Sequence, residues 1–199
     1  MKDNTNFDAI TSSARIWDSE VPIVIDRTNN AVTAYLTGQI SEPNHYNELC
    51  HMLTNADQST AFTIHLNTPG GIIDSAFMIA ASIKKSHAHV VAELSGTVAS
   101  AGTIICMACD DISVSDHLTF MIHNYSGGMA GKGHEMKARQ KFLDEHLNKA
   151  FKSFYDGFLN SEEMDRVIEG TDMWMSTEEV CERWKTRKSN SLSYNKHAA

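Results

Sequence analysis

Two successive segments of this chain have the same order of a short apolar strand, a turn of small residues, and a helix. The first has a strand at residues 62–66 and a helix at about 74–84, separated by Asn-Thr-Pro-Gly-Gly. The second has a strand at 90–94 and a helix at about 100–107, separated by Ser-Gly-Thr-Val-Ala. Strands that alternate with helices in this way predict a largely parallel sheet, so we expect an α/β fold.

Other elements follow from the same patterns of apolar and β-branched residues. Strands are expected at 21–25, 31–36, 112–115 and 119–122, and a helix at 43–53. The stretch 126–133 is too rich in glycine for a stable helix, and we expect a mobile loop or a weak strand there.

Apolar residues recur at helical spacing from Met136 to Phe158, which predicts one long helix at about 134–159. Its apolar stripe is as consistent with packing inside the domain as with a contact to another subunit. Ser161 is expected to cap a helix at 162–169, and Ser176 to open a last helix. Asp172 is then predicted to lie in a loop between these two helices.

The length and composition indicate one globular domain. The chain has 199 residues, of which 42% are hydrophobic and 21% are charged. We expect a polar N-terminal segment at 1–20, a folded domain at 21–184, and a loose C-terminal tail at 185–199, where periodicity and apolar content are lost.

Charge and hydropathy exclude some classes of partner. The formal net charge of −8 argues against nucleic acid, because binding to phosphates is driven by basic side chains. The N-terminus lacks the basic and apolar regions of a signal peptide, and no apolar run approaches the length of a membrane span. The sequence therefore predicts a cytoplasmic protein with no membrane partner.

The chain has four cysteines, and only Cys106 and Cys109 form a CxxC pattern. With His117 and His123 they would make a candidate zinc site. However, both cysteines lie in an apolar helical run, where cysteine commonly behaves as a small buried side chain. We therefore favour a core position and predict no metal.

Three short motifs contain residues suited to hydrolytic chemistry. Ser100 lies in Gly-Thr-Val-Ala-Ser-Ala-Gly at a strand-to-helix turn, where small neighbours leave its hydroxyl open. The turn at 67–71 ends in two glycines that leave backbone N–H groups uncovered, and His123 ends an apolar strand. Taken singly, each motif is more often a helix cap, an ordinary turn or a satisfied edge residue.

Together these motifs resemble the Clp protease proteolytic subunit family. The resemblance rests on Asn-Thr-Pro-Gly-Gly, Gly-Thr-Val-Ala-Ser-Ala-Gly and Phe-Met-Ile-His in that order, followed by a glycine-rich stretch and a long helix. It covers about residues 36–182, including the segment 171–176 around Asp172. It implies a fold of repeated ββα units, as in the crotonase-like superfamily, with a long protruding helix.

The resemblance also implies roles for individual residues. Ser100 would be the nucleophile, His123 the general base and Asp172 the residue that orients the histidine. The intervals between them are 23 and 49 residues, similar to those of the family. The chemistry would need no metal and no organic cofactor.

Backbone groups complete the implied site. The N–H groups of Gly71 and Ala101 would form an oxyanion hole, and Gly70 and Ile72 would align the substrate backbone as an added strand.

The resemblance predicts a serine endopeptidase that acts on peptide or protein substrates within a homo-oligomeric ring. The resemblance also implies an AAA+ unfoldase as partner, but the short link at 26–34 that precedes Thr37-Gly38-Gln39 argues against docking to one. The compact sequence is also similar to phage-encoded capsid-maturation proteases. Two other functions stay open: an acyl-CoA hydratase or isomerase on a crotonase-like fold, and a catalytically silent scaffold subunit.

Overall fold

The fold is known from a computed structural model that describes residues 23–28 and 30–197. The polar segment predicted at 1–20 lies outside these residues. No described helix is both long enough and apolar enough to cross a membrane.

The fold is built on one mixed sheet with the strand order β1-β2-β3-β4-β6-β7, in which β5 also pairs with β4. The strands are β1 (Ile23–Thr28), β2 (Ala31–Thr37), β3 (Ala61–Thr68), β4 (His89–Ala99), β5 (Asp111–Val114), β6 (Thr119–Ile122) and β7 (Met173–Met175). Strands β2, β3, β4 and β6 are parallel, whereas β1 and β7 are antiparallel to their neighbours at the two edges. The largely parallel α/β architecture predicted from the sequence is confirmed.

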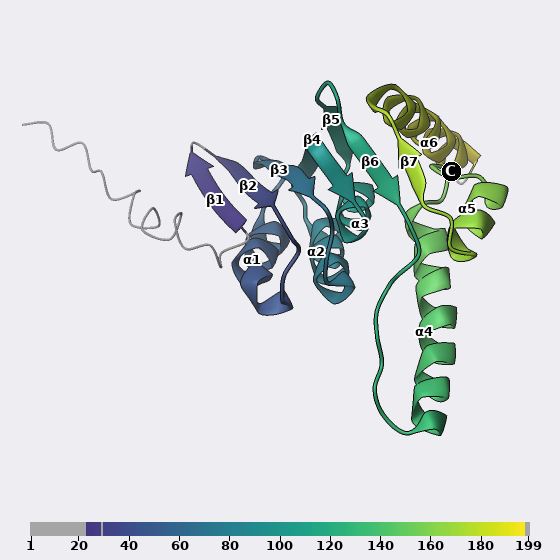
Figure 1. The fold of residues 1–199 in the computed structure, drawn as a ribbon. Coiled ribbons are helices and arrows are strands. Elements are labelled where there is room, and N and C mark those ends of the chain that lie inside the picture. The colour runs from purple at the N-terminus through teal and green to yellow at the C-terminus, as the bar shows by residue number, and fades with distance from the viewer. Residues whose placement is uncertain (1–22, 29, 198–199) are drawn as a thin grey trace, which may run out of the picture.

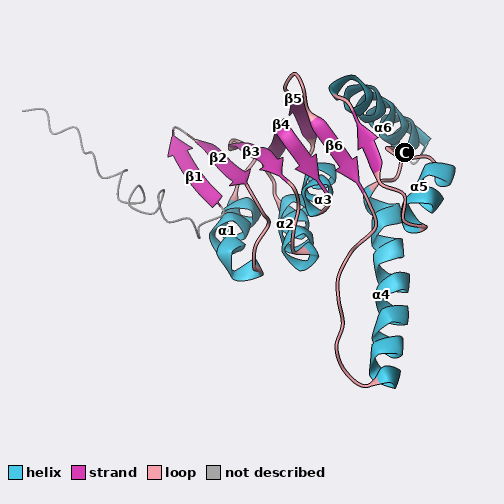
Figure 2. Ribbon diagram, in the orientation of Figure 1, coloured by secondary structure: helices cyan, strands magenta, loops and turns pink. Residues whose placement is uncertain are grey.

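Helices α1, α2 and α3 cover one face of this sheet, and α4 extends away from it (Figures 1 and 2). A short 3-10 helix (Pro43–Tyr46) leads into α1. The helices are α1 (Asn47–Asn55), α2 (Ile73–Lys85), α3 (Ala101–Ala108), α4 (Gly133–Phe154), α5 (Ser161–Ile168) and α6 (Thr177–His197).

The core lies between the sheet and helices α1 to α3. Alternate side chains of β3 and β4 point toward the helices and are fully buried, among them Ile64 and Val90. All residues of α3 are buried, which explains why its sequence is apolar on every side. Cys106 lies inside this helix and Cys109 directly follows it, and both are buried as predicted.

Two strands differ from the prediction. β4 continues through the expected turn at 95–99 and ends at Ala99, because Val98 and Ala99 pair with β6. β7 was not predicted at all: Met173, Trp174 and Met175 form a short edge strand on β6. The loop that contains Asp172 therefore leads from a helix into a strand rather than into a second helix.

The long predicted helix exists but ends earlier, at Phe154. The chain then turns through Gly157, whose φ of +72° favours glycine. Phe154 is not free for another subunit, because it stacks on Phe77 at 5.8 Å and lies under the Lys84 ammonium. Residues 126–132 of the glycine-rich stretch form neither helix nor strand and run beside α4, which begins at Gly133 (Figure 1).

Most of the segment that the sequence predicts as a loose tail, 185–199, is helical, because α6 continues to His197. Arg187 explains part of this extension. Its guanidinium donates to the carbonyl oxygens of Met107 and Phe154, near the C-terminal ends of α3 and α4. A cation satisfies such orphan carbonyls well, so α6 is held against both helices.

The N-terminal cap of α5 also differs from the prediction. Asn160, not Ser161, caps α5, and it forms a capping box with Glu163. The Glu163 carboxylate binds Arg183 of α6 through two oxygens, at 2.7 and 2.9 Å. These hydrogen bonds hold the pKa of Glu163 below its ordinary value.

We expect Glu163→Gln to lower the free energy of unfolding by about 1–3 kcal/mol at pH 7. A carboxyl whose pKa is lowered by folding stabilises the protein above its unfolded pKa of about 4.3, and this stabilisation is lost as the pH falls through the folded value. Urea unfolding at pH 7 and at pH 3 should therefore show a difference between the variant and the wild type that shrinks in acid.

The matched control is Glu162→Gln, a neighbouring exposed position on the same helix, which should change stability by less than about 0.5 kcal/mol. An equal loss for Glu163→Gln at both pH values would contradict the role of its charge.

Candidate active site

Ser100 lies at the junction between β4 and α3, in a backbone conformation that is unusual for serine. Its φ is 54° and its ψ is −125°. A side chain other than glycine at positive φ is strained, and such strain concentrates at functional sites. The Ser100 N–H donates to the carbonyl oxygen of Met121 at 2.9 Å, which holds the turn against β6.

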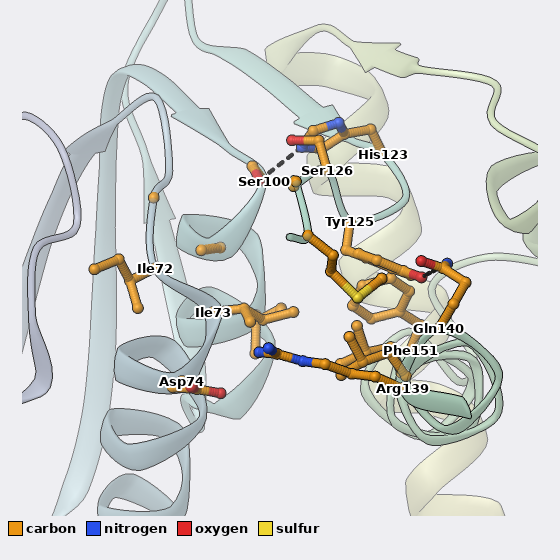
Figure 3. Close-up of a pocket in the computed structure, with 18 of the residues that line it drawn as sticks. Ile72, Ile73, Asp74, Ser100, His123, Tyr125, Ser126, Arg139, Gln140 and Phe151 are labelled. Atoms are coloured by element: carbon orange, nitrogen blue, oxygen red, sulfur yellow. Dashed lines mark hydrogen bonds between the residues drawn. The ribbon is translucent and has the colours of Figure 1, made fainter. Parts of the chain in front are cut away.

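His123 directly follows β6 and contacts this serine. Its Nε2 lies 2.7 Å from the Ser100 Oγ (Figure 3). This contact exists because β4 and β6 are parallel neighbours, with Ala99 opposite Met121. The two strands therefore end side by side, and the residues beyond their ends meet.

Asp172 is brought to the other side of the histidine by β7. The antiparallel pairing places Ile122 opposite Met173. Asp172, the residue before β7, therefore lies beside His123, the residue after β6. The His123 Nδ1 lies 4.0 Å from the Asp172 Oδ1. This is an electrostatic contact that is longer than a hydrogen bond.

The two glycines after β3 lie against the serine turn and against Ile40. A Cβ on Gly70 would lie 2.5 Å from the Cβ of Ser100, and one on Gly71 would lie 2.1 Å from the Ile40 carbonyl oxygen. Both residues also have positive φ, at 96° and 151°. Only glycine permits this close approach of three backbone segments.

Two backbone N–H groups remain open beside Ser100. Ala101 is the first residue of α3, where an N–H has no partner within the helix. Among the backbone hydrogen bonds of turns, loops and helix caps in the described part of the chain, neither the Ala101 N–H nor the Gly71 N–H is a donor. Both residues line the same cavity as Ser100.

Gly70 and Ile72, which are expected to align the substrate backbone, both use their N–H groups within the chain. The Gly70 N–H donates to Thr68 Oγ1 at 3.0 Å, and the Ile72 N–H donates to the Ile40 carbonyl at 3.0 Å. Neither N–H is therefore free for an added strand, and the alignment of a substrate backbone by these two residues stays a prediction.

Ser100 and His123 open into a cavity of about 520 Å³ between α2, α3 and α4. Apolar residues of α4 line it, among them Phe151, and so do Arg139 and Gln140 of the same helix (Figure 3). Arg139 points across the cavity toward the start of α2, where Asp74 lies.

Sequence patterns did not predict Tyr125 in this cavity. Its hydroxyl donates to the Asp144 carboxylate and accepts from Gln140, so it ties the segment after His123 to α4. The hydrogen bond to Asp144 raises the pKa of the Tyr125 phenol. No motif marks these residues, because the pairing depends on the path of the glycine-rich segment beside the helix.

The zinc site considered from the sequence does not form among the residues that the structure describes. Cys106 and Cys109 are enclosed by apolar side chains, and burial raises the pKa of the Cys106 thiol to about 12. A thiol must lose its proton to bind zinc, so this environment opposes metal binding.

We expect Gly71→Ala to lower the free energy of unfolding by at least about 2 kcal/mol, because the new methyl group would meet the Ile40 backbone at a strained φ. Thermal unfolding followed by circular dichroism would measure this. Gly133→Ala is the control, since a Cβ there has no neighbour within 4 Å, and it should be neutral. A stable Gly71→Ala variant would contradict the proposed close approach.

Comparison with known proteins identifies the same family by a family model and by individual relatives. The Clp protease family model matches residues 19–183. The ATP-dependent Clp protease proteolytic subunit of Streptococcus suis is 27% identical over 180 residues, which is 80% of this chain and 91% of the relative. Proteolytic subunit 1 of Chlamydia abortus is 30% identical over 136 residues, which is 64% of this chain and 68% of the relative. The chain thus belongs to the Clp protease family.

Proposed function

We propose that this protease is a serine endopeptidase that uses Ser100, His123 and Asp172 as a catalytic triad. The observation that carries the proposal is the 2.7 Å contact between the Ser100 Oγ and the His123 Nε2, both of which line the cavity. Membership in the Clp protease family supports the hydrolysis of peptide bonds.

In the first step, His123 accepts the proton of the Ser100 hydroxyl as the Oγ attacks the carbonyl carbon of a peptide bond. For Nε2 to accept this proton, the neutral ring carries its own proton on Nδ1, which faces Asp172. The imidazolium that forms is stabilised by the Asp172 carboxylate at 4.0 Å. His123 then donates the proton to the leaving amine, and water releases the acyl group.

The N–H groups of Ala101 and Gly71 are the proposed donors to the oxyanion. Each such donor lowers the barrier by roughly 3–4 kcal/mol in related chemistry. Ala101 contributes as the first residue of α3, whose dipole also favours negative charge. Gly71 contributes from the turn that Ile40 holds in place.

We further propose that the protein assembles into a homo-oligomeric ring that cleaves short peptides without ATP. The support is the form of α4, which stands away from the body of the subunit (Figure 1). Phe142 on this helix is 63% exposed and Trp174 on β7 is 61% exposed. Large exposed aromatic side chains are common at protein interfaces.

Labelling with a fluorophosphonate tests the proposed chemistry. We expect covalent modification of Ser100 in the wild type, located by peptide mass mapping. Ser100→Ala, His123→Ala and Asp172→Asn should each lose most peptidase activity on a short unstructured peptide, without additive effects because the triad acts as a unit.

A Ser100→Ala variant with full turnover would overturn the proposal. Absence of labelling in the wild type would instead favour the silent scaffold or the acyl-CoA hydratase considered from the sequence.

The assembly is tested by sedimentation velocity at micromolar concentration. We expect a species much larger than the 22.1 kDa chain, and Phe142→Glu should shift it toward smaller species. Phe142 is the residue to change because its side chain is exposed, whereas Phe154 of the same helix packs against Phe77 within the subunit. Trp174→Glu changes the exposed aromatic residue on β7. If it leaves the sedimentation unchanged while Phe142→Glu alters it, the subunit contact involves α4 and not β7. An active wild type that sediments as a monomer would refute the ring.

A further inference from the structure

Two buried hydroxyl groups lie behind Ser100, and the proposed triad does not use them. Thr103 is in the first turn of α3, and Tyr155 directly follows α4. Thr103 is fully buried and Tyr155 is 2% exposed. The Thr103 Oγ1 lies 2.6 Å from the Tyr155 hydroxyl and 2.7 Å from the Ser100 carbonyl oxygen.

The number of protons settles the direction of these hydrogen bonds. A carbonyl oxygen can only accept, so the single Thr103 hydroxyl proton goes to Ser100. Tyr155 must then donate its proton to the Thr103 Oγ1. Burial raises the pKa of the Tyr155 phenol, so it keeps this proton at neutral pH. The chain therefore runs in one direction, from Tyr155 through Thr103 to Ser100.

The carbonyl at the end of this chain belongs to the same peptide unit as the Ala101 N–H. Because a peptide unit is planar, fixing the direction of the Ser100 carbonyl also fixes the direction of the Ala101 N–H. The Thr103 N–H donates to the same carbonyl at 2.9 Å. Two donors thus hold the Ser100–Ala101 peptide unit in place, next to the strained φ of 54° at Ser100.

Tyr155 is itself firmly held. Its N–H donates to the Phe151 carbonyl, and its own carbonyl accepts from the N–H groups of Phe158 and Leu159, each at 2.9 Å. Its ring forms part of the cavity wall. The hydroxyl therefore comes from a rigid support at the end of α4.

We propose that Tyr155 and Thr103 are positioning residues for the oxyanion site. They hold the Ser100–Ala101 peptide so that the Ala101 N–H points into the cavity. Hydrogen bonds to the carbonyl also polarise the peptide and make this N–H a stronger donor. The inference rests on the proposed serine peptidase function and assigns to it two hydroxyl groups that lie behind Ser100, away from the reacting atoms.

The expected effect is on the transition state and not on substrate binding. Thr103→Val removes the hydroxyl that contacts the carbonyl and should lower kcat about tenfold, less than the loss of an entire oxyanion donor. Tyr155→Phe keeps the ring and should lower kcat by about threefold to tenfold. KM should stay within twofold in both variants, because the substrate-binding surface is unchanged.

A peptide aldehyde gives a second measurement. The Ser100 Oγ adds to the aldehyde carbon, its proton passes to His123, and the carbonyl oxygen becomes the oxyanion of a tetrahedral adduct. Such transition-state analogues depend on the oxyanion donors. The inhibition constant should therefore rise by the same factor as kcat/KM falls. A purely structural role would not couple these two quantities.

Three further variants separate positioning from loss of stability. Thr103→Ser keeps the hydroxyl and should retain kcat within about twofold. The double variant Thr103→Val with Tyr155→Phe should be no slower than Thr103→Val, because both changes break one chain. Ser82→Ala removes a buried hydroxyl that donates to the Met78 carbonyl on α2, so it is a matched control and should leave kcat unchanged.

The outcomes distinguish this inference from the proposed function. Absence of fluorophosphonate labelling in the wild type refutes the peptidase function, and the inference with it. If the wild type is labelled at Ser100 but Tyr155→Phe and Thr103→Val keep the wild-type kcat and aldehyde affinity, the peptidase function stands and the positioning role is wrong. A loss of kcat in Ser82→Ala equal to that in Tyr155→Phe would assign the effect to stability and would also overturn it.

Discussion

Residues 70 and 71 pass between two other backbone segments at distances that exclude any side chain. On one side, the Ile40 N–H donates to the Gly70 carbonyl and the Ile40 carbonyl accepts from Ile72. On the other side, a Cβ at position 70 would collide with Ser100. This contact joins the ends of β2, β3 and β4 and fixes the distance between the glycine turn and α3. The proposed oxyanion donors lie on its two sides, so their spacing depends on it.

The order of the strands determines which residues meet at this edge. Residues after β3, β4 and β6 come together because these strands are parallel and lie next to each other in the sheet. Ligand sites of parallel sheets commonly form at the carboxyl ends of strands. Asp172 arrives differently, because it precedes the antiparallel strand β7. The pairing of this single edge strand with β6 thus places the Asp172 carboxylate beside His123.

Behind this edge, helix contacts connect the site to the rest of the molecule. Arg187 of α6 binds carbonyl groups near the ends of α3 and α4, and Tyr155 follows directly after α4. The hydroxyl chain from Tyr155 to Ser100 therefore begins at a point held by three helices. If it positions the Ala101 N–H as we propose, the packing of α4 and α6 contributes to the geometry of the oxyanion donors, which lie on neither helix.

The sequence by itself determined the parallel α/β core, because apolar strands and small-residue turns repeat along the chain at short range. It also marked Ser100, His123 and the glycine turn as candidates, although their roles stay predictions. It did not indicate β7, since three residues carry too little periodicity, nor the helical continuation over 185–197, which depends in part on Arg187 reaching α3 and α4. Only the tertiary structure placed Asp172 opposite His123 and Tyr155 behind Thr103, because these contacts join residues 49 and 52 positions apart. Strand register and helix packing set such long-range contacts, and no local pattern of residues records them.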